Sequence, residues 1–360
     1  MSWLHARKDN GRIFYMDLEK LYGQVNDIIS SLDFDRIWKG FKPLKFALYN
    51  DEKCFFDGKY LPKNDAFCAN TTIVYEGEQI AIWNVTDELP TTKLVSKIVH
   101  EMFHGYQTLQ GWNCFADEME ALCRYKYDAD NLCLKLRENE LLLRLYDRFD
   151  EDLYNELLSH RKYRSEKYPY EYSYESKVEE IEGTATYVEW MVLKQLDTQA
   201  AEKMTNQMRV MMTNPEKLFP IRISCYYSGA FMVSALSAAG EYSFSSVERP
   251  VVCSVLKNVS TSNGNFPEKE SFYRKASDAL SAFEAESRSI INSALKKNEV
   301  VLTGPLELLY VNIYDARFYN GYMTSNYFIL YRDENGKNML NGSFVIETTD
   351  GKTIAKVYSL

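Results

Sequence analysis

Histidine is scarce in this chain of 360 residues, with only four copies, so little imidazole is available for metal binding or acid–base chemistry. A basic excess is also missing. The chain has 42 Lys and Arg residues and 51 Asp and Glu residues, a net charge of -9, which argues against a protein whose main function is to bind nucleic-acid phosphates. No run approaches the roughly 18 apolar residues of a membrane span, and the first residues lack the apolar stretch of a signal peptide. We therefore expect a cytoplasmic, water-soluble protein without nucleic-acid or membrane partners.

Paired cysteines are missing as well. The seven cysteines are odd in number and scattered, without a CxxC pair or a zinc-ribbon spacing. This usage predicts reduced, mostly buried thiols with no part in metal binding. The composition, 46% apolar and 26% charged, is that of a globular protein and excludes a disordered chain, a collagen-like fibre and a coiled coil.

The pattern of apolar residues changes along the chain. Residues 12–38 have helical spacing, whereas 45–50, 72–75 and 79–85 are short and rich in β-branched and aromatic residues, which predicts a small sheet of about three strands. From Thr91 to about Lys297 the pattern is helical. Strand signals return at 308–314, 327–331, 343–348 and 353–358, with Asn335-Gly336 and Asp350-Gly351 as hairpin turns that need positive φ at both positions.

These segments predict an α+β fold that is mostly α. We expect one domain over residues 1–299, with a sheet at about 45–85 and a helical bundle, and a β meander over 300–360 that forms a separate segment or lies against the helical body.

Leu94 to Gln107 (LVSKIVHEMFHGYQ) is the strongest local signal. Its apolar residues predict a helix over about residues 91–110. His100 and His104 lie four positions apart, slightly more than one turn, so both imidazoles lie on one face and can bind one metal ion. Glu101 lies beside the first histidine, where it can take a proton from water instead of binding the metal.

The motif HEMFHGYQ resembles the active-site helix of the zincin metallopeptidases, in which a third ligand lies downstream. In the metzincin branch that ligand is a histidine after HxxGxxH, but this chain has Gln107 and Gln110. In the gluzincin branch it is a glutamate on a second helix, followed by a small residue and an alanine. Glu182-Gly183-Thr184-Ala185 has that form, and the gluzincin resemblance covers roughly residues 45–230.

Helical periodicity over about residues 175–197 supports Glu182 among the neighbouring acids. Glu182 lies on the flank of an apolar stripe, whereas Glu179 and Glu180 are expected to point largely away from it. Glu189 shares the flank of Glu182 and is the alternative ligand or an outer-shell partner. Gly183 costs about 1 kcal/mol relative to alanine within a helix, so we expect another backbone to approach it closely.

The chain departs from the gluzincin pattern in two places. Seventy-seven residues separate His104 from Glu182, which predicts a helical insertion between the two metal-binding helices. Thr186 stands where thermolysin-like enzymes carry an aspartate that steadies a histidine ligand. We expect Glu189, Asp117 or Glu120 to take over that role.

The resemblance implies a zinc-dependent peptidase that acts on peptides or proteins. Zinc bound by His100, His104 and Glu182 would activate a water molecule and polarise the scissile carbonyl. Glu101 would take the proton from water and pass it to the leaving amine. The substrate would add as a strand to the edge of the small sheet, at Gln79–Val85 or at Thr72–Tyr75.

A donor to the oxyanion is also expected. Arg222 to Phe231 (RISCYYSGAF) resembles the Tyr-x-x-Gly-Ala segment of several related bacterial families, which nominates Tyr226 and then Tyr227. An aromatic residue packed in a small-residue helix interface explains the same segment equally well.

The two remaining histidines are weaker candidates. His160 could be the oxyanion donor, but beside Arg161, Lys162 and Arg164 we expect it on a solvated basic face. His5 is expected at the surface. Two other interpretations of the whole chain remain: a zincin-fold binding or regulatory protein that holds zinc without proteolysis, and a helical scaffold with a chance HExxH and no metal.

Overall fold

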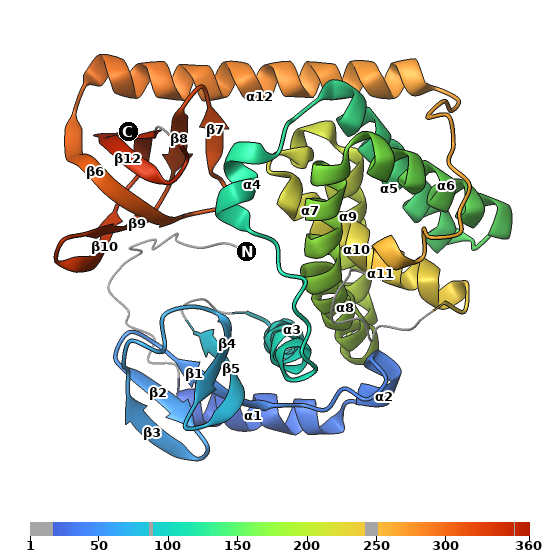
Figure 1. Ribbon diagram of the computed structural model, residues 1–360. Coiled ribbons are helices and arrows are strands. Elements are labelled where there is room, and N and C mark those ends of the chain that lie inside the picture. The colour runs from blue at the N-terminus through green and yellow to red at the C-terminus, as the bar shows by residue number, and fades with distance from the viewer. Residues whose placement is uncertain (1–16, 86–88, 242–250, 349) are drawn as a thin grey trace. The chain divides into compact units, whose positions relative to one another are not determined.

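The computed structural model describes residues 17–85, 89–241, 251–348 and 350–360 (Figure 1). The chain divides into two compact units, called unit 1 (residues 1–109 and 191–198) and unit 2 (residues 110–190 and 199–360). Unit 1 combines helices with a five-stranded sheet, and unit 2 combines helices with a seven-stranded antiparallel sheet. The predicted α+β class is therefore confirmed.

In the described part of unit 1, two helices come first, five strands follow, and a third helix comes after the strands. Its elements are α1 (Leu18–Ser31), α2 (Phe34–Ile37), β1 (Lys45–Tyr49), β2 (Lys53–Phe56), β3 (Lys59–Pro62), β4 (Thr71–Tyr75), β5 (Glu78–Asn84) and α3 (Thr91–Leu109). The helical spacing predicted over residues 12–38 corresponds to two helices, α1 and α2, because Leu32 has extended backbone and Asp33 caps a new helix by accepting the Arg36 N–H at 3.2 Å. Residues 12–16 lie outside the described residues.

The sheet of unit 1 has the order β3-β2-β1-β5-β4, with β1 and β5 parallel and the other pairs antiparallel. The prediction of about three strands missed the β2–β3 hairpin. Its two-residue turn, Asp57-Gly58, has φ of 48° and 76°, the positive values that a type I′ turn requires at both positions. An aspartate–glycine pair between two short apolar runs was the available signal.

The two edges of this sheet are β3 and β4. Strand β5 pairs with β1 on one side and with β4 on the other, so the prediction that Gln79–Val85 offers an edge is wrong, and the alternative segment Thr72–Tyr75 lies at an edge. Alternate side chains of the central strands point to opposite faces. Phe46 stacks on Tyr22 of α1, whereas Tyr49 packs on Phe67 on the other face.

Unit 2 begins with α4 and contains most of the helices. They are α4 (Glu118–Arg124), α5 (Ala129–Asp147), α6 (Glu151–Lys167), α7 (Pro169–Val178), the π-helix η1 (Glu179–Gly183), α8 (Thr184–Leu196), α9 (Thr198–Thr213), the 3₁₀-helix η2 (Pro215–Leu218), α10 (Ile221–Ala238), α11 (Val251–Ser254) and α12 (Lys269–Lys297). The second metal-binding helix, predicted as one α-helix over about 175–197, is therefore α7, η1 and α8 in succession. The last residues of α8, from Met191, belong to unit 1.

The C-terminal sheet of unit 2 starts at Val300. Its strands are β6 (Val300–Val311), β7 (Arg317–Tyr319), β8 (Tyr322–Ser325), β9 (Phe328–Asp333), β10 (Gly336–Asn341), β11 (Phe344–Thr348) and β12 (Thr353–Ser359). The order β10-β9-β6-β12-β11-β8-β7 corrects the predicted meander, because β6 lies between β9 and β12. Both predicted hairpins are present, and Gly336 and Gly351 at their turns have positive φ.

Helices of unit 2 cover both faces of this sheet (Figure 1). Met119 and Leu122 of α4 pack on one apolar face, and Ile291 and Ala294 of α12 pack on Val345 of the other.

The domain boundary between residues 299 and 300 stays a prediction. The seven cysteines are free thiols, and four of them are buried. None of the helices in the described ranges is long and apolar enough to cross a membrane.

Candidate metal centre

Helix α3 carries three of the predicted site residues and packs directly on the sheet of unit 1. Gly105 permits this contact, since a Cβ at that position would lie 2.4 Å from the Leu44 side chain and 2.9 Å from Oγ1 of Thr72 in the edge strand β4. The predicted apolar face is buried, and so are His100 and Glu101, which are 4% and 5% exposed. The histidine pair is therefore anchored beside the edge strand.

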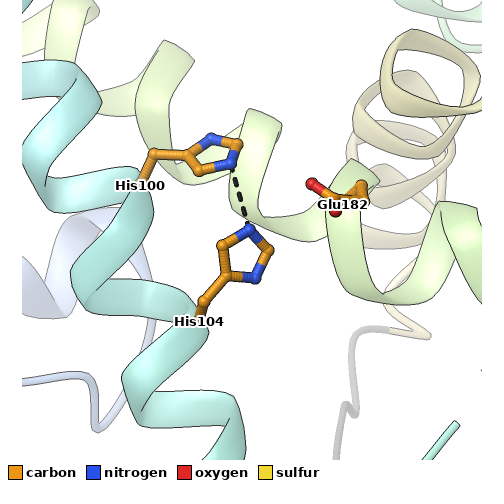
Figure 2. A group of neighbouring side chains, drawn as sticks. All are labelled: His100, His104 and Glu182. Atoms are coloured by element: carbon orange, nitrogen blue, oxygen red, sulfur yellow. Dashed lines mark hydrogen bonds between the residues drawn. The ribbon is translucent and has the colours of Figure 1, made fainter. Parts of the chain in front are cut away.

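The two histidines of α3 turn toward one another. Their Nε2 atoms are 3.1 Å apart, and Figure 2 shows the rings on the same side of the helix. Two nitrogens bound tetrahedrally to one zinc at about 2.0–2.1 Å lie about 3.3–3.4 Å apart. The separation of the Nε2 atoms thus matches a shared metal ion to within a few tenths of an ångström.

Gln107 fixes the second histidine. Its Oε1 lies 2.8 Å from Nδ1 of His104, so the Nδ1–H donates to the amide oxygen. This tautomer leaves Nε2 of His104 as the lone-pair nitrogen, which a metal requires. Sequence reasoning used Gln107 only to exclude a histidine ligand and missed this contact, although residues three apart on a helix are neighbours.

Glu182 lies in unit 2, in the π-helix η1. Gly183 beside it confirms the expected close approach of another backbone, which is that of α10. A Cβ on Gly183 would lie 2.5 Å from Cα of Gly229, and a Cβ on Gly229 would lie 2.7 Å from the carbonyl oxygen of Glu179. Two glycines therefore let η1 and α10 touch, and this contact fixes the backbone that carries Glu182.

Arg222 of α10 contacts Glu182 and was missed by sequence reasoning. Its Nη2 donates to Oε1 of Glu182 at 2.7 Å and to the hydroxyl of Tyr226 at 3.1 Å. Its Nη1 donates to Oε1 of Glu118, whose Oε2 accepts the hydroxyl of Tyr174 at 2.7 Å. Arg222 stands four residues before Tyr226, a helical spacing that could have linked the two, but Glu118 is 104 residues away in sequence.

The predicted oxyanion donor Tyr226 is buried beside this pair. Burial, together with the nearby Glu182 carboxylate, raises the pKa of Tyr226 well above its usual value, although Arg222 opposes the shift. The hydroxyl therefore stays protonated at neutral pH and can donate a hydrogen bond. Tyr227 is partly buried and packs against the same core, and its candidacy stays a prediction.

The prediction for His160 is wrong. It is 4% exposed, its Nε2–H donates to the Leu134 carbonyl at 3.0 Å, and burial lowers its pKa. Arg161 and Arg164 are also buried, so the expected solvated basic face is the interior of unit 2. The segment around His160 looks basic in the sequence because the glutamates that pair with its arginines lie on other helices. His5 lies outside the described residues.

Glu179 and Glu180 are also buried, although both were expected to point away from the apolar stripe. Glu179 accepts Lys135 Nζ at 3.0 Å, Ser228 Oγ at 2.5 Å and the guanidinium of Arg161. Burial alone would raise the pKa of Glu179, but Arg161 and Lys135 outweigh it and bring it to about 2. The carboxylate of Glu180 accepts only the Val251 N–H among the described hydrogen bonds, and burial raises its pKa to about 8.

Glu179 belongs to an ion-pair cluster inside unit 2. Three cations and three carboxylates are at most 1% exposed and contact one another at 4.0 Å or less: Lys135, Arg161, Arg164, Glu138, Glu175 and Glu179. The formal charges cancel, which is the condition under which buried charges are tolerated.

Asp117 and Glu120 are occupied within α4. Asp117 caps the helix by accepting the Glu120 N–H at 2.9 Å, and the Glu120 carboxylate pairs with Arg124 at 2.6 Å. The outer-shell role expected for them stays a prediction. Glu189 is buried, and its outer-shell role stays a prediction.

One group in the described part of the chain has the donors and spacing of a metal site. A ligand atom from each of His100, His104 and Glu182 lies within 4.8 Å of the others, so the group could hold a metal ion (Figure 2). Glu189 is not part of this group. Compared with protein-family models, with curated proteins and with solved structures, the chain matches none of them.

Proposed function

We propose that the protein is a zinc-dependent peptidase of the gluzincin type, acting on peptides or proteins in the cytoplasm without a nucleic-acid or membrane partner. The observation that carries this proposal is the meeting of the two Nε2 atoms at 3.1 Å on one helix, with a carboxylate oxygen of Glu182 as the third donor within 4.8 Å. His100 and His104 belong to unit 1 and Glu182 to unit 2, so the proposal includes one ion bound by ligands from both units.

The donor set fits zinc. Two imidazole nitrogens and one carboxylate are the ligands of several hydrolytic zinc sites, whereas calcium and magnesium select sites made of oxygen alone. Three protein ligands leave a fourth position for water or substrate. When bound, the ion would act as a Lewis acid toward a water molecule and the substrate carbonyl.

The remaining steps are assigned to side chains of this chain. Glu101, beside His100 and buried, would take the proton from the attacking water and pass it to the leaving amine. Tyr226 would donate a hydrogen bond from its hydroxyl to the developing oxyanion. The open edge of β4, which Gly105 brings against α3, would pair with an extended substrate. A zincin-like arrangement of sheet and helices is part of the same proposal.

Elemental analysis of the zinc-replete protein and a peptide-library digest test the proposal. We expect about one zinc per chain and cleavage that falls about 100- to 10,000-fold in Glu101→Gln, the range for a lost general base, while zinc is retained. Glu166→Gln is the matched control, because Glu166 is an exposed carboxylate that pairs with Lys162 within α6, and it should cleave as the wild type does.

Absence of zinc from the wild type would contradict the proposal at its first step and favour the chance motif. Zinc without cleavage in either the wild type or Glu101→Gln would instead favour the alternative, a zinc-holding binding or regulatory protein.

A further inference from the structure

Arg222 connects the proposed third ligand to two other polar groups of unit 2. Its two terminal nitrogens divide between two carboxylates, with Nη2 on Glu182 and Nη1 on Glu118. The Nη2 group also reaches the Tyr226 hydroxyl at 3.1 Å. One planar guanidinium therefore holds the carboxylate proposed to bind the metal and the hydroxyl proposed to meet the oxyanion.

The guanidinium is itself fixed in place. Arg222 is 8% exposed and lies over the rings of Tyr226 and Tyr314, 5.4 Å and 6.0 Å from their centres. Glu118 is fixed in turn by the Tyr174 hydroxyl at 2.7 Å. A carboxylate hydrogen-bonded to a residue held by this many contacts keeps one orientation, which is the function of an outer-shell partner at a metal site.

We propose that Arg222 is the positioning residue for Glu182, an inference that rests on the proposed function. It occupies Oε1 of Glu182, so the carboxylate presents its other oxygen to the metal and binds through one atom. The same Nη2 group sets the Tyr226 hydroxyl relative to that ligand. A lysine has one nitrogen instead of a fork, so it cannot bridge both carboxylates with this geometry.

Arg137 is a matched control. Like Arg222 it is nearly buried, at 6% exposure, and it divides its two terminal nitrogens between two carboxylates, Glu140 and Glu156. None of these residues is a site residue. Substituting Arg137 therefore reproduces the loss of a buried guanidinium without touching Glu182.

The test measures zinc affinity by competition with a chromophoric chelator, and the visible absorption of the cobalt-substituted protein. In Arg222→Gln we expect zinc affinity to fall about 10- to 100-fold, the usual effect of losing an outer-shell partner, with an altered cobalt spectrum. The zinc affinity of Arg222→Lys should lie between those of the wild type and Arg222→Gln. Arg137→Gln should keep the affinity and spectrum of the wild type while its thermal midpoint falls.

Wild-type affinity and an unchanged cobalt spectrum in folded Arg222→Gln would overturn the role of Arg222 while leaving the proposed function intact. Absence of zinc from the wild type would instead overturn the proposed function. If Arg222→Gln fails to fold because two carboxylates lose their cation, the double variant Arg222→Gln with Glu118→Gln removes that imbalance. Measured against Glu118→Gln, it should show the same loss of affinity, and equal affinities would overturn the inference.

Discussion

Glu179 and Glu182 lie three positions apart in one π-helix, and their carboxylates meet opposite electrostatic settings. Glu179 belongs to a cluster whose three cations and three carboxylates cancel. Arg222 pairs with both Glu118 and Glu182, so one cation there faces two carboxylates. The ion-pair cluster has as many cations as carboxylates, whereas Arg222 is shared between two carboxylates. The ratio of cations to carboxylates therefore differs between the structural glutamate Glu179 and the proposed ligand Glu182.

Glu179→Gln should produce the largest effect on stability. It leaves Lys135 and Arg161 buried with one uncompensated positive charge, so the free energy of unfolding should fall by about 3–5 kcal/mol. Denaturant titration of the metal-free protein measures this. Zinc affinity of the folded variant should stay within a few-fold of the wild type. Glu156→Gln, which removes a carboxylate that is 44% exposed, should cost less than about 1 kcal/mol.

Glu182→Gln should instead lower zinc affinity strongly and change stability little. Zinc affinity should fall by more than about 100-fold, beyond the effect of losing an outer-shell partner, because the amide gives the metal no negative charge. The unfolding free energy of the metal-free protein should change by no more than about 1 kcal/mol, since Arg222 keeps Glu118. Chelator competition on Glu182→Gln and Glu189→Gln decides between the two candidate ligands. Loss of zinc in Glu189→Gln alone would refute the assignment to Glu182.

Gly183→Ala tests whether the contact between η1 and α10 fixes the positions of both Glu179 and Glu182. The added Cβ would lie 2.5 Å from Cα of Gly229, so the helices must separate, and we expect a loss of about 1–3 kcal/mol in unfolding free energy. Gly23→Ala in α1 is the control, because a Cβ there meets nothing within 4 Å. It should gain up to about 1 kcal/mol from helix propensity. Equal gains in the two variants would contradict the close contact.

The smallest expected effect concerns the buried histidine His160 and the pH dependence of unfolding. Burial lowers its pKa in the folded protein, so below the unfolded value of about 6.5 the unfolded chain binds a proton that the folded chain resists. The stabilisation from neutral His160 is therefore fully present above pH 6.5 and is lost as the pH falls. The slope cannot exceed about 1.4 kcal/mol per pH unit for one proton. Unfolding of the metal-free protein between pH 5 and 7 should depend less on pH in His160→Gln.

Local spacing predicted what depends on neighbours along one helix. The four-residue interval between His100 and His104, and the apolar face of α3, follow from helical geometry, and the structure confirms the helix. Gly183 was likewise understood as a point of close backbone approach. The identity of the approaching helix was not predictable, because α10 lies about 40 residues further along the chain.

Long-range charge pairing could not be predicted. Arg164 and Arg161 follow His160 in a segment that looks solvated, yet their partners Glu138 and Glu179 lie 26 and 18 residues away. The link from Arg222 to Glu118 spans 104 residues. Periodicity reports which side of a helix is apolar, but it does not report which buried charges meet. The π-helix was missed for a similar reason, because nothing in the composition of EEIEG distinguishes it from an α-helical turn.

The π-helix has an evolutionary consequence. A π turn contains one residue more than an α turn, and the simplest origin of such a turn is a single-residue insertion into an older α-helix. Deleting one residue from η1 would remove the π turn and shift the side chains inside it relative to α10. The contacts of Gly183 with Gly229 and of Glu182 with Arg222 both start from this turn. Any lineage that keeps this site is therefore expected to keep the length of the helix here, even where its amino acids drift.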